Sequence, residues 1–404
     1  MSTLKGVIAF SIAGLFLLYE FILQVSPQVM AKDIIGSTGT STALFGTMAS
    51  MYFYAYAPGQ LFTGVSYDRF GAKLTLFVSC LLCTSGSLLI FLFHNIYIFG
   101  LGRMLTGLGS ASAFVGALYI GKQYFGTGKF FLVVGLTELL GCIGAIVGIV
   151  PLAFLVMKIG WINSMLVFVI VGIVLLFLMS TCIQSVKKKP QPVKHVPGAS
   201  RKRIKEILTN NQTWAIGLYA LTLFAPVTIL ASLWGVPFLE SIGLDIESAS
   251  VAIAIIWVGI AIGSLGFSFV SERLRRRKPL LTFFPILGFV VSIGTIYLTG
   301  SYVFTILFLF VFGISISGQA LSFNVVSDNN KMENAGTAMG FHNMFVVLSG
   351  AIFQPIASYL INLFNGDSND ITYSSFALAL SIIPVLFLLS YLIAKFWLKE
   401  SKAI

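Results

Sequence analysis

The stretch Lys187-Lys-Lys-Pro-Gln-Pro-Val-Lys-His-Val-Pro-Gly-Ala-Ser-Arg-Lys-Arg-Ile-Lys-Glu206 decides how the chain is organised. It forms the centre of the longest polar segment, 185–213, in a chain that is 57% hydrophobic and 10% charged, with a mean hydropathy of +0.95. Average soluble proteins are about 25% charged. Because apolar runs long enough to cross a bilayer adjoin this segment on both sides, the composition excludes a soluble protein and indicates a polytopic helical membrane protein.

Six apolar runs precede the polar segment and six follow it. Each is long enough to cross about 30 Å of hydrocarbon as a helix. We therefore expect an all-α membrane protein with an N-terminal six-helix bundle at 1–184, a basic linker at 185–213 and a C-terminal six-helix bundle at 214–404. The runs cover roughly residues 7–28, 43–62, 74–93, 97–119, 130–155, 162–184, 214–238, 249–270, 280–299, 303–326, 337–361 and 373–396.

The basic residues predict the orientation in the membrane. When the loops are assigned alternately to two sides, 22 of the 25 Lys and Arg residues fall on one side, and Lys32 and Lys158 fall on the other. Cytoplasmic loops carry the excess of basic residues. We therefore expect a multi-pass protein of the inner (cytoplasmic) membrane with both termini and the linker in the cytoplasm. The net charge of +11 then reflects contact with the bilayer surface rather than with nucleic acid.

The two halves of the sequence resemble each other. A shift of 204 residues places Asp68 and Arg69 on Glu272 and Arg273, and Lys73 on Arg277. This favours two six-helix units related by duplication. The four cysteines all lie inside apolar runs, so neither a disulfide framework nor a metal site is indicated, and no cofactor is expected.

A short polar turn between the second and third runs reads Gly64-Val-Ser-Tyr-Asp68-Arg69-Phe-Gly71-Ala-Lys73. It is either an orientation signal or a conformational latch. A carboxylate here can face the positive N-terminal end of a helix from the other half and hold the inner side shut. As a latch, Asp68 would cap the eleventh helix near Ala335, and Glu272 would face the fifth helix near Lys129. The proposed latch residues are Asp68, Arg69, Lys73, Glu272 and Arg273.

This turn resembles the signature loop of the major facilitator superfamily, which has the form GxxxDRxGRR at this place, with Ala72 replacing one basic residue. The segment Arg103-Met-Leu-Thr-Gly107-Leu-Gly109 is similar to the RxxxGxG pattern of that superfamily's fourth helix. The resemblance implies twelve helices in two pseudo-repeats and secondary active transport by alternating access. The segment Tyr19–Pro27 also resembles, more weakly, the first helix of nutrient and amino-acid importers of bacteria that live inside host cells.

Three charged residues lie well inside predicted helices, namely Glu20, Arg103 and Glu138. Each costs about 2.5–3.5 kcal/mol on insertion scales and needs a purpose or a partner. Glu20 and Arg103 have similar predicted depths, so we expect them to form a contact, with the guanidinium also available to a substrate carboxylate. Glu138 lies nearer the inner side without a basic partner, and we expect it to carry a proton. A purely structural ion pair is the alternative.

Further candidate site residues are uncharged or weakly basic. His342, in the eleventh run, is either a hydrogen-bonded packing residue or a contact for the proton or substrate. Tyr19, Tyr52 and Trp257 are the aromatic residues that we expect to face a central cavity. Asn324, in the tenth run, is a polar group that a cavity would satisfy, although a hydrogen bond between helices would serve equally well.

Together these features predict a monomeric, proton-coupled importer of a small polar solute such as an amino acid or related zwitterion. Proton-driven efflux of a drug or metabolite is the alternative within the transporter class. A membrane-embedded enzyme and a non-transporting receptor are alternatives from other classes, but few polar residues accompany Glu20, Arg103 and Glu138 at membrane depth, which disfavours catalysis. No enzymatic activity is expected.

The predicted orientation has a direct test. Because the basic residues place the 185–213 linker in the cytoplasm, a protease added outside intact cells should leave it uncut. The same protease should cut the linker in inverted membrane vesicles. Cleavage from outside intact cells would reverse the predicted orientation.

Overall fold

The computed structural model describes residues 3–125, 130–183, 205–274, 276–298, 300–331, 335–366 and 371–400, and these residues form helices joined by short turns, with no strand among them. Ten helical stretches within them are apolar and long enough to cross a bilayer. One of these, Val133–Cys182, is divided into two spans, and the first part of α3 (Thr42–Leu92), which is rich in Ser, Thr and Tyr, adds another. The expected twelve-helix architecture is confirmed.

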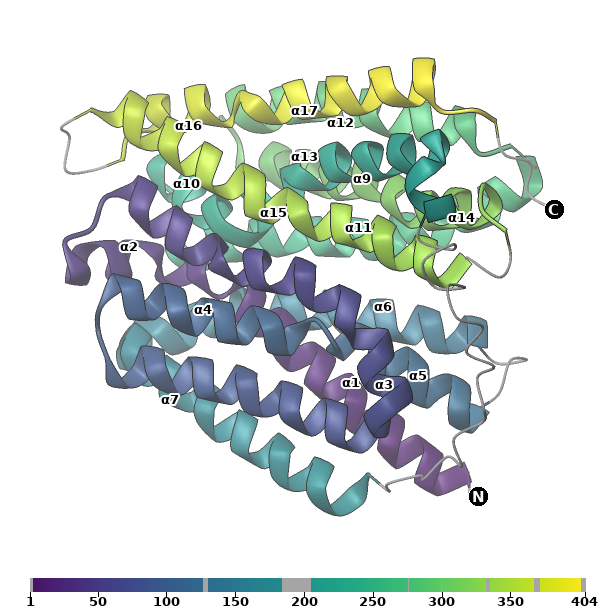
Figure 1. Ribbon diagram of the computed structural model, residues 1–404. Coiled ribbons are helices and arrows are strands. Elements are labelled where there is room, and N and C mark those ends of the chain that lie inside the picture. The colour runs from purple at the N-terminus through teal and green to yellow at the C-terminus, as the bar shows by residue number, and fades with distance from the viewer. Residues whose placement is uncertain are drawn as a thin grey trace.

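The first half of the chain contains α1 to α7 (Figure 1). The first predicted run, 7–28, is divided at Ser26, because Pro27 has no main-chain N–H and so ends one helix and begins the next. The helices are α1 (Thr3–Val25), α2 (Pro27–Thr38), α3, α4 (Ile96–Ser110), α5 (Ala113–Phe125), α6 (Phe130–Val147) and α7 (Val150–Cys182).

The second half begins after the linker, of which 184–204 lies outside the described residues, while 205–209 is helical. The proposed linker boundaries therefore stay predictions. The helices that follow are α9 (Asn211–Ile229), η2 (Leu230–Trp234), α10 (Gly235–Ser241), α11 (Ile246–Leu274), α12 (Lys278–Tyr297), α13 (Tyr302–Ile316), α14 (Gly318–Asp328), α15 (Ala335–Asn365), α16 (Tyr373–Leu380), α17 (Ile382–Leu392) and η4 (Ile393–Trp397).

Two glycines divide long helical stretches into separate spans. Gly71 in α3 has φ 76° and ψ 171°, and Gly160 in α7 has φ 77° and ψ 164°. This backbone conformation is open almost only to glycine, because a Cβ atom would clash with the main chain. Each glycine reverses the chain within one residue, so that the second span returns alongside the first.

Irregular helical turns occur at equivalent positions in the two halves. A shift of 204 residues places Ser26, between α1 and α2, on Leu230, where the π-helix η2 begins. The same shift brings the junction between α4 and α5 next to the junction between α13 and α14 at Ser317. The internal repeat predicted from the sequence is thus visible in where the helices lose regularity.

The two halves meet along two seams, α3 against α15 and α6 against α11. In the first seam Gly46 lies against Ser358, and the ring of Phe53 lies against Gly350, where any side chain would overlap it. The 204-residue shift relates the first part of α3 to α11 and α6 to α15, so the seams are equivalent. Close helix contact through small residues is typical of membrane helix pairs.

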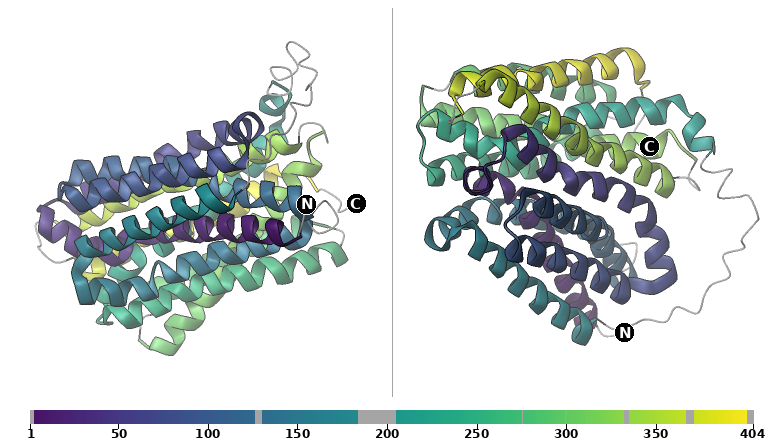
Figure 2. Two further views of the ribbon diagram at one scale, coloured as in Figure 1. Left: turned by 90° about the horizontal axis from the view of Figure 1, so that it is seen from below. Right: turned by 60° about the vertical axis from the view of Figure 1, so that its left-hand side comes forward.

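α1 begins and η4 ends at the same end of the molecule, which we call the terminal end (Figure 2). α2 and α10 lie at the opposite end, which we call the far end (Figure 1). An even number of spans requires that both chain ends lie on one side of the bilayer, as this arrangement shows.

The glycine at the α7 break gives a stability prediction. Gly160→Ala should lower the free energy of unfolding by about 1–3 kcal/mol, because alanine at φ 77° is strained although no neighbouring atom lies within 4 Å of its Cβ. Gly135→Ala, at a helical position of α6 with equally open surroundings, is the matched control. Thermal unfolding in detergent compares them, and equal stability of the two variants would contradict the strain argument.

Candidate substrate and proton site

Glu20 lies inside the first half rather than at its surface. Its side chain is 1% exposed, and the carboxylate Oε2 accepts a hydrogen bond of 2.7 Å from the Tyr52 hydroxyl. Tyr52, on α3, is itself fully buried. The arrangement follows from membrane energetics, since an ionisable group in hydrocarbon requires a hydrogen-bonding partner.

Arg103, on α4, is 3% exposed and lies on the other side of the same tyrosine, with its Cζ atom 4.6 Å from the Tyr52 ring centroid. Its Nε donates to the Ala49 carbonyl at 3.2 Å, and its two Nη atoms donate to the carbonyls of Leu23 and Gln24. A small cavity beside the guanidinium is lined by Ser26, Ser87, Thr106 and Met165.

The predicted contact between Glu20 and Arg103 is therefore wrong. No ion pair joins them among the described residues, and Tyr52 links them instead, through its hydroxyl on one side and its ring on the other. The physical reason is that main-chain carbonyls and an aromatic face satisfy a guanidinium as well as a carboxylate does. Sequence spacing gives depth but cannot foresee which carbonyls a helix break leaves available.

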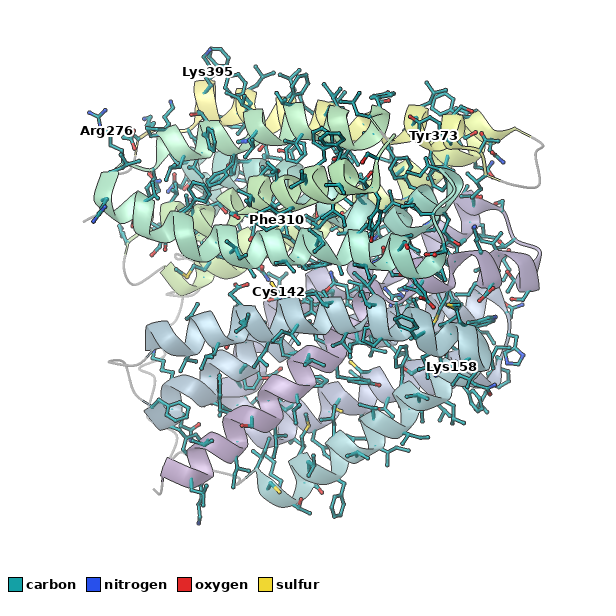
Figure 3. The ribbon with its side chains drawn as sticks, turned by 180° about the vertical axis from the view of Figure 1, so that it is seen from behind. Cys142, Lys158, Arg276, Phe310, Tyr373 and Lys395 are labelled. Atoms are coloured by element: carbon teal, nitrogen blue, oxygen red, sulfur yellow. The ribbon has the colours of Figure 1, made fainter. Side chains whose placement is uncertain are left out.

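Glu138 has a different environment. Its side chain is exposed on α6 and forms no ion pair with any described residue. It lies one helical turn from Cys142, on the same side of α6. Figure 3 shows Cys142 on the edge of the first half that faces the second half. Of the three charged residues, Glu138 is therefore the one whose side chain is exposed rather than enclosed in its half.

An aromatic pair joins the halves next to α6. The ring of Phe21, on α1, meets Trp257, on α11, edge to face with centroids 6.0 Å apart. Phe21 also packs on Gly141 of α6. The Trp257 Nε1 atom is buried and has no hydrogen-bond partner among the described residues. This unpartnered donor belongs to a residue at the contact between the two halves.

The other predicted aromatic contact, Tyr19, faces away from the seams. Its hydroxyl donates to the Phe168 carbonyl of α7 at 2.9 Å, and the residue is 1% exposed. Neighbouring positions on a helix point about 100° apart, and Tyr19 is directed to α7 while Glu20 is directed to Tyr52 of α3. Tyr19 belongs to the packing between α1 and α7.

In the second half, His342 of α15 is fully buried between α15 and α14. Its Nε2 lies 2.8 Å from the Ser322 hydroxyl, and its ring stands edge to face with Phe323, 4.7 Å between centroids. This is the packing arrangement that the sequence left open. Asn324 is exposed near the terminal end of α14.

The proposed latch residues are described only in part. The side chains of Asp68 and Glu272 lie outside the described residues, as do those of Ala335 and Lys129. Arg69 lies over the adjacent Phe70 ring at 5.3 Å, and Arg273 is exposed in the last turn of α11. Lys73 donates to the Ser180 carbonyl near the C-terminus of α7, where the negative end of the helix dipole stabilises a cation.

Contacts at the far end were not foreseen from the sequence. The Gln28 Nε2 atom of α2 donates to the Ala231 carbonyl of η2 at 2.8 Å, and Lys32 pairs with Glu240 of α10 at 3.1 Å. A polar Gln28 inside an apolar run was the available signal. Its partner is a carbonyl in a π-helix, which no sequence pattern reveals.

A helical bundle of two six-helix repeats, with ionisable groups at membrane depth and seams between the halves, defines a secondary transporter of small solutes. The sequence model of the Major Facilitator Superfamily family matches residues 8–355, and the chain belongs to that family. It is a multi-pass membrane transporter and not an enzyme.

Curated relatives are moderately similar over most of the chain. The hexuronate transporter of Bacillus subtilis (strain 168) is 26% identical, covering 83% of this chain and 83% of its own. The membrane sensor protein UhpC of Salmonella typhimurium (strain LT2) is 24% identical, covering 83% of this chain and 80% of its own.

Solved structures share the fold at lower identity. The nucleoside transporter NupG has a TM-score of 0.78 at 13% identity, over 97% of this chain and 99% of its own. An inward-facing, unoccupied bacterial homologue of the lysosomal transporter Spinster has a TM-score of 0.75 at 16% identity, over 98% of this chain and 96% of its own.

The buried hydroxyl of Tyr52 gives the next prediction. Tyr52→Phe keeps the ring against Arg103 but removes the donor to Glu20, so it should lower the free energy of unfolding by about 1–3 kcal/mol. Tyr54→Phe, on the same helix with a 46% exposed side chain, should have little effect. Thermal unfolding of both variants in detergent is the measurement, and an unchanged Tyr52→Phe protein would mean that Glu20 does not need this donor.

Proposed function

We propose that this protein imports a small polar solute in symport with protons, and that Glu138 carries the proton. The observation behind the proposal is the exposed Glu138 carboxylate, which lies one turn of α6 from Cys142 at the edge facing the second half (Figure 3). It has no ion-pair partner among the described residues. A lone carboxylate at membrane depth can bind a proton on one side and release it on the other as the accessible side changes. Glu20 and His342 are enclosed within their halves, which favours Glu138.

The substrate class that these groups favour is an amino acid or related zwitterion. The aromatic rings of Phe21 and Trp257, which meet between the halves, attract an ammonium group through their faces. The unpartnered Nε1 of Trp257 offers a donor to a substrate oxygen. Arg103 already donates to main-chain carbonyls through Nε and both Nη atoms, so it is not assigned to the substrate carboxylate.

A sugar acid is the second candidate substrate. It is favoured by the relatives, one of which is a hexuronate transporter and another a probable galactarate/D-glucarate transporter, each about a quarter identical to this chain. Counterflow in vesicles against amino acids, hexuronates, nucleosides and D-xylose separates the candidates. Exchange with the hexuronates alone would exclude the zwitterion.

The proposed transport cycle is rocking of the two halves around this site. The far end is closed by Gln28 and by the pair of Lys32 with Glu240, while Asp68 and Glu272 are proposed to close the terminal end in the alternate state. With the terminal end in the cytoplasm of an inner-membrane protein, the observed contacts correspond to a state closed to the outside. We propose that the functional unit is a monomer, because each chain supplies both halves.

Proton coupling through Glu138 predicts a separation of exchange from accumulation. Glu138→Gln keeps the size and polarity of the side chain but cannot carry a proton, so it should still exchange labelled substrate across the bilayer and should not concentrate it when a proton gradient is applied.

Vesicles containing the variant are compared for counterflow and for gradient-driven uptake. Glu247→Gln, in the first turn of α11, is the control for losing one carboxylate. Normal accumulation by Glu138→Gln would transfer the proton role to another group.

A further inference from the structure

The break between α1 and α2 leaves a carbonyl that needs a donor. In a continuous helix the Leu23 carbonyl would accept a hydrogen bond from the main-chain N–H of residue 27, but Pro27 has none. An unsatisfied carbonyl in the membrane interior is costly, since no water is at hand to replace the missing donor. The Ser26 hydroxyl reaches this carbonyl at 3.1 Å.

Arg103 provides the remaining donors. One Nη atom bonds to the Leu23 carbonyl, the other bonds to Gln24 at 3.1 Å, and Nε bonds to Ala49 of α3 at 3.2 Å. The planar guanidinium thus spans three carbonyls on two helices, and the Tyr52 ring covers its face. A lysine ammonium is a single point charge and cannot reproduce this fork.

The break sets the direction of α2, and α2 makes the far-end contacts. Gln28 follows Pro27 directly and donates to the Ala231 carbonyl in η2, and Lys32 lies one turn further on, paired with Glu240. The direction in which α2 leaves the break therefore decides whether these side chains reach the second half.

We propose that Arg103 is a positioning residue that replaces the amide hydrogen bond missing at Pro27 and thereby holds α2 in the orientation that closes the far end between the halves. Arg103 acts on transport through the main chain of α1, without touching the substrate. The proposal rests on the proposed function only where transport is the readout, because far-end closure is measured without a substrate.

The test is a double-mutant cycle between Arg103→Lys and Pro27→Ala. Cysteines at positions 32 and 240, in a Cys182→Ser background, report closure through a short bismaleimide cross-link, because the three remaining native cysteines are buried. They remove the Lys32–Glu240 pair from every variant alike, so the comparison measures closure through the Gln28 contact. A protease site placed in the linker separates the halves afterwards, so that only cross-linked halves migrate together.

We expect Arg103→Lys to lower the ratio of closed to open molecules about tenfold, the effect of losing one charged hydrogen bond. Pro27→Ala restores the main-chain donor to Leu23, so in the double variant the same arginine change should cost no more than about threefold. Arg276→Lys, at an exposed position, is the matched control.

Equal losses with and without Pro27→Ala, or an unchanged cross-link in Arg103→Lys, would overturn the proposal. If Arg103→Lys fails to fold, folding of the double variant supports the proposal and its failure to fold overturns it. If closure responds as expected but the wild-type vesicles transport none of the four substrate classes, the proposed function fails and the positioning role remains.

Discussion

The Leu23 carbonyl, deprived of its amide donor by Pro27, is the point at which Arg103 joins three helices of the first half. Hydrocarbon offers no water to a broken helix, so side chains have to supply the donors, here the Ser26 hydroxyl and a guanidinium from a neighbouring helix. Arg103 supplies it from α4 and at the same time bonds to α3, which fixes three helices relative to one another. The fixed geometry of a guanidinium, planar with several donors, suits a break better than any single hydroxyl.

The three ionisable groups at membrane depth are accommodated in three ways. Arg103 donates hydrogen bonds to carbonyls and lies over an aromatic face, and Glu20 accepts a phenolic hydrogen bond from Tyr52. Glu138 has neither among the described residues and is exposed on α6. A group with fixed partners holds structure, whereas a group without them is available to a mobile ion or substrate. This contrast separates the structural charges from the one that we propose to be functional.

The internal repeat explains why the contact at the far end joins equivalent positions of the two halves, although the residues at those positions differ. Ser26 and Leu230 are equivalent under the 204-residue shift, and both mark where a helix loses its regular hydrogen bonds. In the first half the loss comes from a proline, and in the second from a π-helical turn. Gln28 connects the two irregular turns by donating to Ala231. Each half thus contributes the irregular turn of its first membrane span to the same contact.

The sequence by itself determined the twelve spans, because each apolar run must bury its own main-chain hydrogen bonds in a helix, and it determined the family through the Asp68 turn and the Arg103 motif. It also singled out Glu20, Arg103 and Glu138, because charge inside an apolar run is visible in one dimension. Only the tertiary structure decided their partners. Direction around a helix axis, the site of a break and the carbonyls it frees depend on packing between residues far apart in the sequence. Arg103 and Leu23 are 80 positions apart, and Gln28 and Ala231 are 203 apart. For that reason Glu20 and Arg103, predicted to form an ion pair, instead each contact Tyr52. The far-end contact of Gln28 likewise depends on how the two halves pack against each other.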